Sequence, residues 1–147
     1  PFPELAESKG VGRTFRLWRD MEIDGMNGLD CVVVFRLDVV REHAEGVQAY
    51  VSGIIAAGDF IEQNPQEASR LGSSYMRNID PALILGGINQ PAGRSIFSDL
   101  LPRSAEYEKL QAYMLKIGAL DQAIDLTKFI DDSFARKAYE GQGGKVQ

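Results

Sequence analysis

The sequence predicts an α/β fold with two or three strands near the start and four or five helices after them. The first observation is residues 31–40, CVVVFRLDVV, whose β-branched and aromatic run from Val32 to Phe35 is typical of a strand buried on both faces of a sheet. The second is the helical period at which apolar residues recur after residue 43. Because so few strands cannot cover so many helices, the sequence also predicts that this chain lacks sheet partners.

The N-terminal third is expected to form a short helix, a strand and a loop. Residues 1–10 place Pro3 in a first helical turn and Gly10 at a C-terminal cap. Residues 12–23 alternate in polarity, which predicts a strand. Residues 24–30, DGMNGLD, are rich in Gly, Asn and Asp, and this composition predicts a loop before the strand at 31–40.

The middle of the chain predicts two consecutive helices and then an irregular segment. Residues 43–62 have one broad apolar face, and the next helix begins with Asn64 as N-cap, Pro65 at the first position and Glu67 as the acid of a capping box. Residues 80–102 hold three Pro and three Gly, and 82–85 fit a short helix or a strand. The inward face of the second helix is predicted to comprise Ala68, Leu71, Tyr75 and Met76.

The last third predicts two amphipathic helices. Ser104 is predicted to cap the first, which ends at Gly118, and Asp125 is predicted to cap the second. The tail, residues 141–147, is expected to be mobile. The inward positions of the last helix are predicted to be Leu126, Phe129, Ile130, Phe134 and Ala138.

Composition excludes several classes of function. The 147 residues are 44% hydrophobic and 25% charged, and the net charge of -5 argues against non-specific binding to nucleic acid or to an anionic membrane. With one cysteine the chain forms no internal disulfide and no zinc cluster. No apolar run reaches the ~18 residues of a membrane span, and no secretion signal is present. We therefore expect either a cytoplasmic protein or a signal that lies outside this chain.

No residue stands out as catalytic, and no metal or cofactor is predicted. His43 is the only histidine and is expected to be solvated or capping, while Cys31 is expected to be a buried, inert thiol. Asp131 and Asp132 are predicted to be neighbours on a helix, where their side chains diverge by about 100°. The Gly-rich segment at 86–93 lacks the Lys-Ser/Thr pair of a phosphate-binding loop.

Five stretches, taken in order, carry a resemblance to a known family: PFPELAESKGVGR, residues 28–40, the helix–Asn-Pro–helix passage HAEGVQAYVSGIIAAGDFIEQNPQEASRL, and the closing segments YMLKIGAL and DLTKFIDDSFARKAY. This order resembles the C-terminal half of the solute-binding proteins of ABC importers for nitrate, sulfonates and taurine, a group that also holds thiamine-precursor binders. The resemblance implies a periplasmic-binding-protein-like (type 2) two-lobe fold, of which this chain is an incomplete C-terminal portion.

On that resemblance the chain has four parts: residues 1–30 are the end of the second lobe, 31–40 a crossover strand, 41–140 the C-terminal helical part of the first lobe, and 141–147 the tail. The sheet is then expected to be completed by a missing N-terminal part of the same protein or by a second chain. A two-lobe protein needs roughly 300 residues at ordinary domain sizes.

The function implied is transport without catalysis. Such a protein captures a small anionic solute by hinge closure and delivers it to an ABC permease, and it is periplasmic or lipid-anchored outside the cytoplasmic membrane. Anions in such clefts are held by helix N-termini and by hydroxyl or amide groups. The predicted ligand-binding residues are therefore Pro1 and Phe2 at the first helix and Asn27, Gly28 and Asp30 in the loop.

Two alternatives remain open from the sequence. The same fold is used by enzymes, pyrimidine-precursor synthases and desulfinases, whose chemistry relies on His or Cys in the cleft; here only His43 and Cys31 are available. The other alternative is a stand-alone helical interaction module built from residues 41–140. The apolar strand at 31–35 argues against this module, which would not need it.

Overall fold

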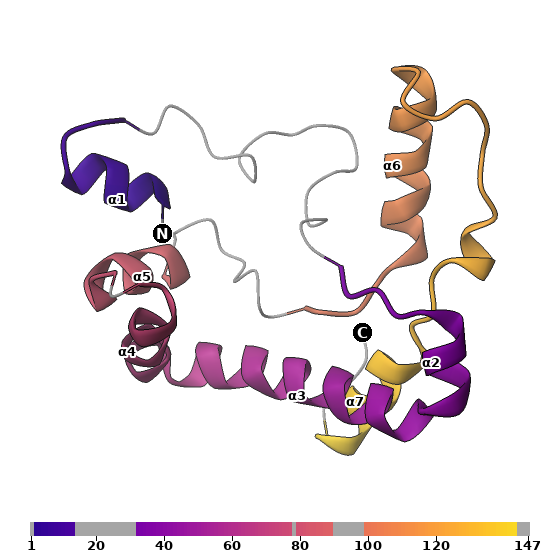
Figure 1. The fold of residues 1–147 in the computed structure, drawn as a ribbon, viewed down its shortest axis with the longest axis horizontal. Helices are drawn as coiled ribbons and strands as arrows, with labels where there is room; N and C mark the ends of the chain where they lie inside the picture. Colours follow the sequence, from indigo (N-terminus) through magenta and orange to yellow (C-terminus); the bar gives the residue numbers. More distant parts are fainter. Residues whose placement is uncertain (1, 14–31, 78, 90–98, 144–147) are drawn as a thin grey trace. The chain divides into compact units, whose positions relative to one another are not determined.

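The part of the chain that the structure describes is helical. The computed structural model describes residues 2–13, 32–77, 79–89 and 99–143, and within these ranges it contains no β-strand (Figure 1). The predicted α/β class, with its type 2 two-lobe arrangement, is therefore wrong for the described chain. The helices are α1 (Phe2–Ser8), α2 (Leu37–Glu42), α3 (Ala44–Gln63), α4 (Pro65–Tyr75), α5 (Pro81–Ile88), α6 (Ser104–Lys116), the 3₁₀ turn η2 (Leu126–Lys128) and α7 (Ser133–Gly141).

The helix predicted at 43–62 is confirmed as α3, and the chain divides into two units within it. Unit 1 comprises Pro1–Asp20 and Ala56–Asp99, and unit 2 comprises Met21–Ile55 and Leu100–Gln147. None of the helices in the described ranges is both long and apolar enough to span a membrane.

Unit 1 is built around the pair α4 and α5, with α1 against α5. α5 begins at Pro81 because the side chain of Asp80 accepts a hydrogen bond from the N–H of Ala82 at 2.8 Å. Gly72 of α4 faces Ile84 of α5, since a Cβ at this glycine would lie 3.7 Å from the isoleucine side chain. The small residue allows the two helices to approach closely.

The α4 helix has the predicted start but a different buried face. Asn64 is its N-cap and Pro65 its first residue, yet the Asn64 side chain makes no capping hydrogen bond and its Nδ2 donates to the carbonyl of Phe60 at 3.3 Å. The residue buried on α4 is Ser69, which was not predicted. Tyr75, predicted to point inward, is 89% exposed. The apolar pattern therefore placed this helix correctly, and Ala68 and Met76 are half-buried as predicted, but Leu71 and Tyr75 are exposed.

Unit 2 has a small core made by α3, α7 and the segment that precedes α6. Ile55, Leu101, Ala135 and Ala138 are its buried members. A hydrogen bond joins the segment to α7, because the N–H of Leu100 donates to the hydroxyl of Tyr139 at 2.9 Å. The core thus depends on contacts between residues far apart in the sequence.

Glycines end two helices where the sequence predicted. Gly118 has a φ of +73°, and the N–H of Ala119 reaches the carbonyl of Met114 at 2.8 Å. Gly10 has a φ of +65°, and the N–H of Val11 bonds the carbonyl of Ala6 at 3.0 Å. Both pairings are six-to-one bonds of a Schellman motif, which requires a left-handed residue and so favours glycine.

The single helix predicted after Asp125 is broken into two pieces. Asp125 caps only η2, and α7 begins at Ser133. Between them the carboxylate of Asp131 accepts a hydrogen bond from the N–H of Ser133 at 3.0 Å, a local bond that competes with continued helix. As a result Phe129 is 73% exposed rather than inward, and Asp131 lies before α7 instead of on a helix beside Asp132.

The strand predicted at 31–40 is also wrong in the described residues. Residues 32–36 have no regular secondary structure, and α2 begins at Leu37 (Figure 1). A strand needs a neighbour to pair with its backbone, and the described chain offers none. The strand predicted at 12–23 and the loop at 24–30 lie almost wholly outside the described residues.

Candidate functional site

The five predicted ligand-binding residues are not brought together by anything that the structure describes. Pro1, Asn27, Gly28 and Asp30 lie outside the described residues. Phe2 is the first residue of α1, and the position of its side chain is likewise outside the description. The solute site therefore stays a prediction.

The described residues show no constellation typical of acid–base or metal chemistry. His43 is the exposed C-cap of α2, where its N–H donates to the carbonyl of Val39 at 2.9 Å. Among described residues no group of three or more His, Cys, Asp or Glu side chains is placed to hold a metal ion. Gly86 and Gly87 belong to α5 rather than to a phosphate-binding loop. Cys31 is not described.

The feature that stands out is a short exposed apolar segment, Val32–Phe35, which we call the valine segment. Val32, Val33 and Val34 are 57%, 50% and 78% exposed. Scattered exposed apolar residues are normal, but three consecutive ones form a continuous strip. Within the described chain, no backbone N–H or C=O of this segment forms a hydrogen bond. Both the side chains and the backbone are thus open to a partner.

The C-terminal end of the valine segment is fixed to unit 2. The Phe35 ring meets the Tyr50 ring of α3 edge to face, with centroids 5.5 Å apart and planes at 90°. Next to it, Arg36 donates through Nε to Asp38 at 3.0 Å, and Asp38 also accepts from the N–H of Val39 at 3.0 Å. The Arg36 hydrogen bond is the main cause that lowers the pKa of Asp38. These contacts hold the segment at the start of α2.

The Gln48 side chain joins α3 to α7. Its Nε2 donates to the carbonyl of Phe134 at 2.9 Å and lies 3.2 Å from the hydroxyl of Ser52. The Phe134 carbonyl belongs to the first turn of α7, so the bond fixes how this helix meets α3. The hydrogen bond therefore links two helices that are far apart in the sequence.

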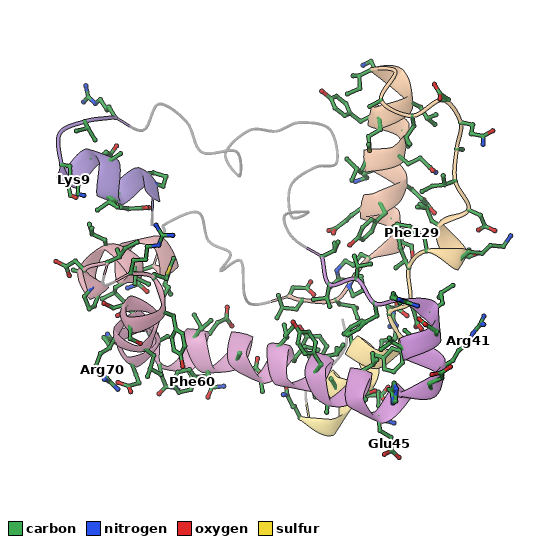
Figure 2. The ribbon with its side chains drawn as sticks, in the orientation of Figure 1. Lys9, Arg41, Glu45, Phe60, Arg70 and Phe129 are labelled. Atoms are coloured by element: carbon green, nitrogen blue, oxygen red, sulfur yellow. The ribbon has the colours of Figure 1, made fainter. Side chains whose placement is uncertain are left out.

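Other exposed apolar residues are spread over both units. In unit 1 they include Phe60, Leu71 and Tyr75, and in unit 2 Ile117 and Phe129; Figure 2 labels Phe60 and Phe129. None of them continues the valine segment in sequence.

Three ion pairs are local to their helices and exposed. Glu67–Arg70 and Asp125–Lys128 are three residues apart, and Asp132–Arg136 four apart. Figure 2 labels Arg70 on α4. Exposed pairs of this kind add little to stability, because water and salt screen the charges. They stabilise helix ends and create no charged cleft.

Sequence reasoning identified the valine segment as a β-forming stretch but assigned it to a buried sheet. It did not predict the contacts of Tyr50 and Gln48. Tyr50 belongs to the broad apolar face predicted for residues 43–62, whereas it is half exposed and contacts Phe35. No local signal in the sequence marks Gln48, because its partner is 86 residues away.

Comparison of the chain with protein-family models, with curated proteins and with solved structures gives no significant match.

Proposed function

We propose that this chain is part of the solute-binding component of an ABC importer, which captures a small anionic solute of the nitrate, sulfonate or taurine kind for a membrane permease. The observation that carries the proposal is the passage from α3 through Asn64 and Pro65 into α4, followed by α6 with its Gly118 cap. These elements stand at the positions where the resemblance rests. On this proposal the protein works outside the cytoplasmic membrane, periplasmic or lipid-anchored.

Capture by hinge closure requires a second body of polypeptide that meets the solute from the other side. On this proposal the exposed valines of the valine segment are part of the surface that the second body covers. The solute site would then be shared between that body and the loop that holds Asn27, Gly28 and Asp30.

The test is calorimetric titration of the protein purified from its native gene, with nitrate, taurine and methanesulfonate, and with sodium chloride as the ionic control. We expect one of the three anions to bind. At a concentration 100 times its Kd it should add about 2.7 kcal/mol to the free energy of unfolding.

A pair of variants separates the loop from general charge effects. Asp30→Ala should change the affinity, whereas Asp121→Ala, at a residue exposed beyond the end of α6, should not. Absence of binding by folded protein to all three anions would refute the proposal. Consumption of the bound compound would instead support the enzymatic alternative.

A second candidate is the helical interaction module formed by residues 41–140. The observation that favours it is that the strand which argued against it is not formed in the described residues. Expression of 41–140 alone decides this point: a cooperative urea transition at the midpoint of the whole chain would support an independent module. Loss of the transition would show that the flanking residues are needed.

A further inference from the structure

We draw no further inference here: the strongest candidate, the exposed apolar surface patch that the valine segment forms ahead of α2, carries no proposal because nothing in the structure shows what covers it.

Discussion

Ile55 gives the sharpest test of the core of unit 2. It is 2% exposed and packs in the cluster with Leu101, Ala135 and Ala138. Ile55→Ala removes three carbon atoms, which costs about 2.4 kcal/mol at ~0.8 kcal/mol per buried methylene. The cavity adds to this cost, and two of the neighbours are alanines, whose short side chains cannot move in to fill it. We expect a loss of about 3 kcal/mol in the free energy of unfolding.

Urea denaturation followed by circular dichroism at 222 nm measures this loss. With a slope of about 2 kcal/mol per molar, the midpoint of the transition should fall by roughly 1.5 M. The matched control is Ile117→Ala, which makes the same chemical change at a residue that is 57% exposed at the end of α6. It should cost less than about 0.5 kcal/mol. Equal losses in the two variants would refute the assignment of Ile55 to the core.

Three further predictions concern two glycines, one hydrogen bond and one carboxylate. Gly118→Ala should destabilise the protein by about 1 kcal/mol, because the φ of Gly118 is +73°. Gly53→Ala, inside α3 with open space around it, should stabilise the protein by about 0.5–1 kcal/mol. Thermal melts in which both variants shift the melting temperature in the same direction would contradict this. Tyr139→Phe removes the acceptor for the N–H of Leu100 and should cost about 0.5–1.5 kcal/mol, with faster amide exchange at Leu100 as the specific readout. The pKa of Asp125 is lowered mainly by a hydrogen bond from the Thr127 hydroxyl and further by Lys128, so the contribution of this carboxylate to stability is present above its ordinary pKa and is lost as the pH falls through its folded pKa. Asp125→Asn should therefore flatten the pH dependence of the urea midpoint below pH 4. An unchanged profile would contradict this.

Local signals in the sequence predicted the ends of helices well. Gly10 and Gly118 both end helices in the left-handed conformation, and Pro65 begins α4. Each of these residues acts on its own backbone within one turn, so the sequence around it contains the information that is needed. The helix break before Ser133 also has a local cause, the hydrogen bond that the Asp131 carboxylate accepts from the N–H of Ser133. The prediction followed the helical period of the apolar residues instead and so missed this break.

Contacts between distant residues were predicted poorly. Periodicity assigned Ala68, Leu71, Tyr75 and Met76 to the buried face of α4; Ala68 and Met76 are half-buried, whereas Leu71 and Tyr75 are exposed and Ser69 is the buried residue. Which side of a helix is covered depends on the neighbour, here α5, and the pattern on one helix does not specify that neighbour. For the same reason the sequence did not predict the hydrogen bond from the Gln48 side chain to the carbonyl of Phe134. The five predicted solute residues remain untested because their side chains are not among those described.

Two short apolar runs show why one prediction of structure succeeded and another failed. Residues 82–85 fitted a helix or a strand, and they form the helix α5. Asp80 caps its first turn, Pro81 sets its first residue, and Ile84 is buried, so the start is specified locally. A helix closes its own hydrogen bonds once it has begun.

The valine segment has stronger β propensity than residues 82–85 and no local device of that kind. A strand cannot satisfy its backbone alone, so propensity without a neighbour produces no strand. The prediction of a buried strand is therefore wrong for residues 32–36, despite their β propensity. In the described residues Val32–Phe35 combine exposed valines with an unpaired backbone, as expected where β propensity meets no neighbouring strand.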